Sequence, residues 1–173
     1  MNQSHRTVFR WWWAWADEAE ERWLEDMARQ GWHLDQIVFP CVYRFRAGEP
    51  RHDVYRLDFV AGGDRRAEYF QLFRDAGWQH LGQEGGWQYF RKTVRPGEAA
   101  EIYTDNASKV TKYQRLVRVL VIFIPILMFN LLITQRHGGW PGPWIQGVQA
   151  GVLALLAFAL VRIGLRIREL KKS

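Results

Sequence analysis

Apolar and charged positions alternate in the chain before Arg115, whereas long apolar runs dominate after it. Two of these runs, residues 116–134 and 144–161, contain 19 and 18 residues with few polar side chains. A helix that crosses a bilayer needs about 20 mostly apolar residues, and each run just reaches that length. The pattern therefore predicts a small soluble domain followed by a hairpin of two transmembrane helices.

The soluble part contains an internal repeat with a constant offset of 46 residues. Val8-Phe9-Arg10 corresponds to Val54-Tyr55-Arg56, Gly31-Trp32 to Gly77-Trp78, and Tyr43 to Tyr89. Similar residue classes at a fixed offset are typical of a duplicated structural unit. The predicted division is a domain of residues 1–95 with repeats at about 5–50 and 51–95, a connector of residues 96–108, and a membrane part of residues 109–173.

Each repeat reads as strand, helix, strand and strand. In the first strand Phe9, Trp11 and Trp13 recur at every second position, so we expect them to share the face that packs on the core. The two repeats together predict an α+β fold. We expect a duplicated βαββ antiparallel sheet with both helices on one face, in a ferredoxin-like layering, followed by the transmembrane hairpin.

The first helix is predicted from its end signals. Asp17 is the expected N-cap, with Glu20 three residues later as in a capping box, and Gly31 is placed to end the helix. The helix carries an acidic run that we interpret as a solvated face, or else as a docking face for a basic partner. The run consists of Asp17, Glu18, Glu20, Glu21, Glu25 and Asp26.

Basic residues flank the two apolar runs on one side only. The loop between the runs contains Arg136 as its single basic residue. The positive-inside rule therefore predicts a multi-pass protein of the cytoplasmic membrane with both chain ends in the cytoplasm. We expect the flanking residues to contact lipid headgroups: Lys109, Lys112, Arg115 and Arg118 before the first run, and Arg162, Arg166, Arg168, Lys171 and Lys172 after the second.

The positive charge of the chain belongs to this membrane part. Residues 1–108 contain 14 Lys and Arg against 17 Asp and Glu, whereas residues 109–173 contain 10 against 1. Nucleic-acid binding by the soluble domain is therefore not expected, because such domains usually carry a basic surface.

Several short motifs together resemble a known family. They are Trp23-Leu24, Met27-Ala28, Gly31-Trp32 and Leu34, then Ile102-Tyr103-Thr104-Asp105, Ser108-Lys109 and Tyr113, followed by the paired apolar runs. In these the chain resembles the bacterial family that carries the domain of unknown function numbered 2812. The resemblance implies a bacterial membrane protein, often encoded beside PadR-type transcriptional regulators. It implies no catalytic residues, because the family has no established activity.

The sequence contains no recognisable catalytic or metal-binding motif. A nucleophilic site would need Ser or Cys beside a base. Cys41 is the single cysteine and has no His or basic residue near it in the sequence, and serine occurs only at Ser4, Ser108 and Ser173. His33 and His80 lack the spacing that would place two metal ligands on one helical face. We therefore expect no catalytic residues, no metal and no cofactor. The alternative is a membrane-bound enzyme that uses His33 or His80 with nearby carboxylates.

The expected binding surface is the face of the sheet opposite the helices. Its residues are Arg10, Trp12, Arg44, Arg46 and Arg56, and guanidinium and aromatic groups together suit anion or peptide recognition. We expect a sensing or docking module at the inner leaflet that signals to a cytoplasmic or membrane protein.

The alternative is a structural or assembly subunit of a membrane complex. Gly147 and Gly151 form a G-x-x-x-G pair that would let a second helix approach closely, either from another membrane protein or from a second copy.

Overall fold

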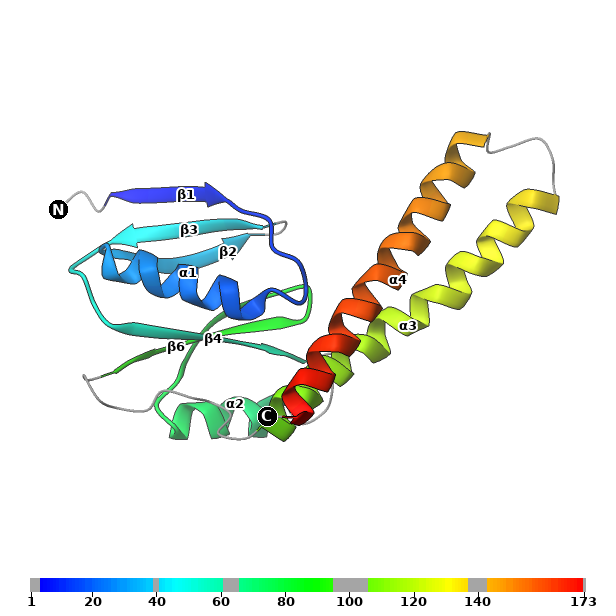
Figure 1. Ribbon diagram of the computed structural model, residues 1–173. Helices are drawn as coiled ribbons and strands as arrows, with labels where there is room; N and C mark the ends of the chain where they lie inside the picture. The colour runs from blue at the N-terminus through cyan, green and yellow to red at the C-terminus, as the bar shows by residue number, and fades with distance from the viewer. Residues whose placement is uncertain (1–3, 39–40, 61–65, 95–105, 137–142, 173) are drawn as a thin grey trace. The chain divides into compact units, whose positions relative to one another are not determined.

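The computed structural model describes residues 4–38, 41–60, 66–94, 106–136 and 143–172 (Figure 1). Two compact units divide the chain, Met1–Thr104 and Asp105–Ser173. The connector at residues 95–105, with its Tyr-Thr-Asp stretch, lies outside the described residues.

The first unit has the predicted α+β fold, built from two copies of strand, helix, strand and strand. Each copy forms its own three-stranded antiparallel sheet, with strand orders β1-β3-β2 and β4-β6-β5. The first copy comprises β1 (His5–Phe9), α1 (Asp17–Arg29), β2 (Trp32–Val38) and β3 (Val42–Ala47). The second comprises β4 (Asp53–Phe59), α2 (Arg66–Asp75), β5 (Gln79–Glu84) and β6 (Trp87–Thr93).

The two copies share local details as well as element order. The pairing of β2 with β3 shifts between Leu34 and Gln36, and the pairing of β5 with β6 shifts between His80 and Gly82, which are the positions 46 residues later. Gly31 and Gly77 both have positive φ, +82° and +81°, as expected for glycines that end a helix. The duplication is therefore structural.

The sequence had suggested that both helices cover one face of a continuous sheet, and the structure differs in this. Helix α1 lies between the two sheets (Figure 1), and its core contains Tyr43 of β3 together with Tyr89 of β6. Helix α2 packs on the opposite face of the second sheet, where Phe73 meets Phe90. Adjacent strand residues point to opposite faces, so Tyr89 and Phe90 belong to different cores.

The prediction for the first strand was wrong in its register. Phe9, Trp11 and Trp13 are 67%, 58% and 44% exposed, while Val8 and Trp12 pack on the core. Strand β1 ends at Phe9, and Val8 pairs with the buried Tyr43, which fixes the faces of the strand. A shift of one position exchanges the two faces of a strand.

The beginning of α1 also differs from the prediction. Its N-cap is Ala16, without a side-chain hydrogen bond, so Asp17 is the first helical residue rather than the cap. The acidic run is not one solvated face, because Asp17, Glu20 and Glu21 are buried whereas Asp26 is exposed.

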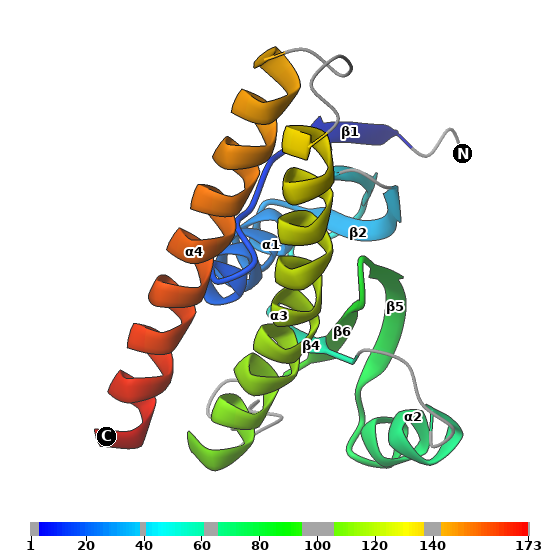
Figure 2. The same ribbon diagram turned by 90° about the vertical axis from the view of Figure 1, so that its right-hand side faces the viewer.

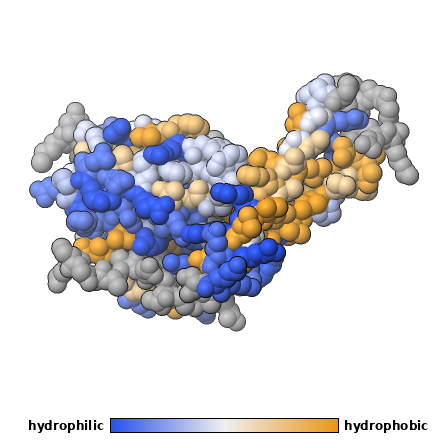
Figure 3. Space-filling view, viewed as in Figure 1, coloured by the Kyte–Doolittle hydropathy of each residue, from blue (hydrophilic) through white to orange (hydrophobic). Residues whose placement is uncertain are grey.

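The second unit consists of two long helices side by side (Figure 2), α3 (Asn106–Arg136) and α4 (Pro143–Lys172). By length and composition, both are suited to cross a membrane, over Lys109–Ile133 and Trp144–Lys172. Hydrophobic side chains cover much of their visible surface (Figure 3). Gln149 donates a hydrogen bond to Asn130 Oδ1 at 2.5 Å, which links the antiparallel helices near the turn.

Candidate functional site

A buried carboxylate joins the two repeats at the core of the first unit. Glu20 of α1 is only 5% exposed. The hydroxyls of Tyr43 and Tyr89 both donate to its Oε1 atom, at 2.6 and 2.7 Å. The three side chains come from α1, β3 and β6, so both repeats position the carboxyl group.

Burial changes the protonation of this cluster. Loss of hydration raises the pKa of Glu20 from 4.5 to about 7, although the two tyrosine hydrogen bonds favour the ionised form. Glu84 and Asp17 raise this pKa further through charge repulsion. Burial likewise raises the pKa of Tyr43 and Tyr89 far above the usual range, so both hydroxyls stay protonated and serve as donors.

A cavity of about 160 Å³ adjoins Glu20. This volume resembles that of cavities that hold one benzene-sized molecule, roughly 150 Å³. Its walls combine carboxylates with aromatic rings, and no Lys, Arg or His is among the described residues that line it. The lining residues are Trp12, Trp13, Ala14, Asp17, Glu20, Cys41, Tyr43, Leu57, Glu84, Gly85, Trp87 and Tyr89.

A contact between the repeats lies in the cavity wall, at Cys41 and Glu84. The backbone N–H of Cys41 donates to Glu84 Oε1 of β5 at 2.8 Å. Cys41 has φ +56°, the only positive value among the described residues other than glycine. A left-handed conformation costs a non-glycine residue about 1–2 kcal/mol. The hydrogen bond that Cys41 donates to Glu84 therefore holds this strained residue against the second repeat.

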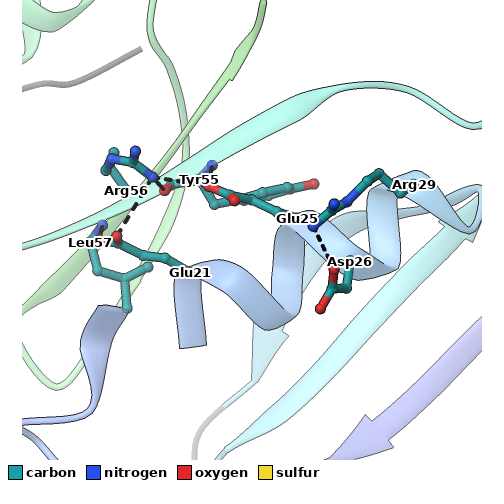
Figure 4. A network of polar contacts seen from close by, with 7 residues as sticks. All are labelled: Glu21, Glu25, Asp26, Arg29, Tyr55, Arg56 and Leu57. Carbon is teal, nitrogen blue, oxygen red and sulfur yellow. Dashed lines mark hydrogen bonds and ion pairs between the residues drawn. The ribbon is translucent and has the colours of Figure 1, made fainter. Parts of the chain in front are cut away.

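Two further acids of α1 fix the helix to strand β4 (Figure 4). Glu21 accepts the backbone N–H of Leu57 at 2.7 Å, and Glu25 accepts that of Tyr55 at 3.4 Å. Arg56 binds Glu25 at 2.9 Å and lies 3.6 Å from Glu21. Strand β4 is an edge strand, so the carboxylates take the place of a neighbouring strand. These contacts hold Glu20, on the same helix, in place.

The structure does not bring the four predicted arginines to one face. Arg44 and Arg46 are exposed on β3, where Arg44 donates to Gln36 and Arg46 pairs with Asp35. The guanidinium of Arg10 instead lies over Trp12 and Trp23, 4.5 and 4.9 Å from the ring centroids. Arg56 belongs to the other sheet and pairs with the acids of α1. The separation follows from the register of β1 and from the division into two sheets.

The two candidate histidines differ in burial, because His33 is buried and His80 is exposed. His33 is buried, with Nε2 2.8 Å from the carbonyl oxygen of Glu49 and Nδ1 3.3 Å from Asp53. Nε2 of His80 lies 3.0 Å from Gln88 Oε1, and its ring contacts those of Phe70 and Phe90, with centroid distances of 4.6 and 5.3 Å. Within the described ranges, no group of three His, Cys, Asp or Glu residues is arranged to hold a metal.

In the second unit the glycine pair faces away from the partner helix. A side chain built at Gly147 or Gly151 would meet nothing within 4 Å, so the pair does not mediate the packing of α4 on α3. The predicted headgroup residues lie on α3, from Lys109 to Arg118, and on α4, from Arg162 to Lys172.

Fold and site together define a class of protein: a two-repeat α+β domain with an acidic, aromatic cavity, followed in the chain by two helices long and apolar enough to span a membrane. The family model described as "Protein of unknown function (DUF2812)" matches residues 16–124, more than half of the chain. The chain therefore belongs to this family, as its motifs had suggested. No curated protein and no solved structure matches it.

Glu20 was not expected to be a site residue, although the sequence contains one signal of it. Leu24 and Met27 follow Glu20 by four and seven residues, and such spacing puts all three on the same helical face. The acid thus lies within the apolar stripe that packs on the core. An ionisable residue in that position indicates either a buried partner or a binding site.

Proposed function

We propose that this chain is a membrane-anchored sensing module whose first unit binds a small molecule in the cavity beside Glu20. The observation that carries the proposal is the construction of this cavity. Residues of both repeats line it, and they hold a buried carboxylate within hydrogen-bonding distance of two tyrosines. Cavities with apolar walls and a few fixed polar groups are typical of small-molecule sites.

The same chain connects the cavity to the membrane helices. Strand β6 contributes Trp87 and Tyr89 to the cavity wall, and only residues 94–105 separate its end from α3. We propose that occupancy of the cavity is communicated through this segment to a regulator or membrane partner. Both chain ends would lie in the cytoplasm of a bacterium, with α3 and α4 in the cytoplasmic membrane.

A cavity-filling variant tests this function. The full chain in dodecyl maltoside is heated with a panel of small anionic, neutral and cationic compounds, and the unfolding midpoint is recorded. Ala14 lines the cavity, so Ala14→Leu fills part of it, whereas Ala67→Leu changes an exposed position on α2. We expect at least one compound of the panel to raise the unfolding midpoint of the wild type and of Ala67→Leu. The same compound should leave the midpoint of Ala14→Leu unchanged.

Two outcomes would contradict the proposal. Equal stabilisation of Ala14→Leu and the wild type would place the binding site elsewhere. A panel without any stabilising compound would remove the sensing function and leave the structural-subunit alternative, in which the exposed face of Gly147 and Gly151 carries the contacts.

A docking function is a second candidate, and Arg44 and Arg46 favour it. Their side chains alternate with the buried Tyr43 and Phe45, so they share the exposed face of the first sheet. Crosslinking of the double variant Arg44→Glu, Arg46→Glu in native membranes tests this surface, with loss of a specific partner as the expected result. An unchanged set of crosslinked proteins would exclude it.

A further inference from the structure

We infer that the ligand of the Glu20 cavity is a small organic ammonium ion. The inference rests on the proposed function, because it names the ligand class of the same site. Its basis is the charge, the aromatic lining and the size of the cavity.

The charge of the lining favours a cation. Asp17, Glu20 and Glu84 contribute three carboxyl groups, while basic side chains are absent from the described lining residues. Both tyrosine donors are directed at Glu20 Oε1. An anion entering the cavity would meet acidic groups without a compensating cation, whereas a cation would neutralise part of the buried negative charge.

The aromatic lining favours an organic cation over a metal ion. Indole rings of Trp12, Trp13 and Trp87 contribute to the walls beside the two phenol rings. Indole and phenol faces attract ammonium groups, and aromatic cages recognise quaternary ammonium ions. The Trp12 ring already binds one cation on a face, because the Arg10 guanidinium lies 4.5 Å from its centroid. A hard metal ion would instead need about six oxygen ligands, and the described residues contain no such cluster.

The volume limits the size of the ligand. About 160 Å³ accommodates a molecule of benzene size, which includes tetramethylammonium and choline. Pockets for drug-sized ligands usually measure 300–1,000 Å³, so this pocket holds only a smaller group, and a larger molecule would extend out of it. The ligand is therefore an ammonium group with few carbon atoms, supplied either as a free amine or as a lipid headgroup.

Protonation of Glu20 competes with the ligand. Because the pKa of Glu20 is about 7, its carboxyl group is neutral in mild acid and ionised in mild alkali. The groups that line the cavity around it are Asp17 on the same helix, Glu84 of β5, Tyr43 of β3, Tyr89 of β6 and the thiol of Cys41. The affinity for an ammonium ion should rise about tenfold from pH 6 to pH 8, following the ionised fraction of Glu20.

The decisive experiment compares choline with its neutral carbon isostere, 3,3-dimethylbutan-1-ol. The full chain in dodecyl maltoside is titrated while tryptophan fluorescence and the alkylation rate of Cys41, the only cysteine, are followed. At pH 8 we expect choline to bind at least about tenfold more tightly than the isostere. Bound choline should also slow the alkylation of Cys41. Glu20→Gln should abolish the preference and its pH dependence, whereas Glu68→Gln, at an exposed position of α2, should retain both.

The outcomes separate the ligand class from the proposed function. If the isostere binds as tightly as choline, or if only anionic or neutral panel compounds stabilise the protein, the ammonium assignment is overturned while the sensing function stands. If no compound of any charge binds, the ammonium assignment and the sensing function are both overturned. The titration is repeated in bilayers of phosphatidylcholine and in bilayers of phosphatidylglycerol to identify the source of the ligand. If choline fails to bind in phosphatidylcholine but binds in phosphatidylglycerol, the headgroup of phosphatidylcholine occupies the cavity and a lipid is the ligand.

Discussion

Tyr43 and Tyr89 occupy equivalent positions in the two repeats, and their hydroxyls meet at a single oxygen atom of Glu20. The repeat has thus placed two identical donors at one acceptor. Glu20 has no acidic counterpart in the second repeat, because the position 46 residues later is Arg66. Duplication produced the symmetrical donors, and the difference between the helices produced one central acid.

Replacement of either tyrosine should destabilise the fold. Tyr43→Phe and Tyr89→Phe each remove a hydrogen bond to a carboxyl group, and we expect a loss of about 1–3 kcal/mol in the free energy of unfolding. The two losses should not add, since both hydroxyls serve the same oxygen. Chemical denaturation of the full chain in detergent measures the double-mutant cycle, and strict additivity would contradict a shared acceptor.

Stability should fall as the pH rises through neutrality. Glu20 has a pKa of about 7 in the folded protein against 4.5 ordinarily, so the folded state binds the proton more tightly. Its contribution is complete below about pH 4.5 and is lost as the pH rises past 7, a change of about 3 kcal/mol. The difference between the wild type and Glu20→Gln isolates this contribution. A difference that stays constant from pH 4 to pH 9 would show that the carboxyl group is not perturbed.

Loss of Glu21 should loosen strand β4. Glu21→Ala leaves the buried N–H of Leu57 without its acceptor, which we expect to cost about 1–3 kcal/mol, while Glu21→Gln retains an acceptor and should cost less. Asp26→Ala on the same helix breaks an exposed pair with Arg29 and should cost at most about 1 kcal/mol (Figure 4). Hydrogen exchange at the Leu57 amide should accelerate in Glu21→Ala and stay unchanged in Asp26→Ala.

Local signals predicted the repeat and its turns, because they depend on short stretches of sequence. Gly31 and Gly77 could be placed at helix ends since few other residues adopt a positive φ. The cavity depends instead on distant contacts. Glu20 meets Tyr43 and Tyr89 across 23 and 69 residues, and neither separation leaves a local pattern.

The same distinction explains the error in the first strand. Alternation alone cannot show where a strand ends, and the faces of β1 were decided by its pairing with β3. The prediction that Arg10 and Arg56 share one sheet face was wrong for a related reason. Their surroundings depend on how the two sheets pack around α1.

The two helix-ending glycines should respond differently to alanine. Both have positive φ and share a backbone cost of about 1 kcal/mol. A Cβ at Gly31 would lie 2.6 Å from the carbonyl oxygen of Gly48, whereas one at Gly77 would lie 3.6 Å from the flexible side chain of Lys92. Gly31→Ala should therefore lower the free energy of unfolding by at least about 1 kcal/mol more than Gly77→Ala. Equal losses would show that the contact with Gly48 relaxes freely.

Cysteine labelling tests the expected topology of the membrane unit. Basic residues flank the outer ends of both apolar runs, so the turn between the helices should face away from the cytoplasm. With Cys41 replaced by serine, a single cysteine is introduced as Ser4→Cys, Gly138→Cys or Ser173→Cys. An impermeant maleimide should label only Gly138→Cys on intact cells and all three after permeabilisation. Labelling of Ser4→Cys on intact cells would place the Glu20 cavity outside the cytoplasm, and its ligand would then have to come from the surroundings of the cell.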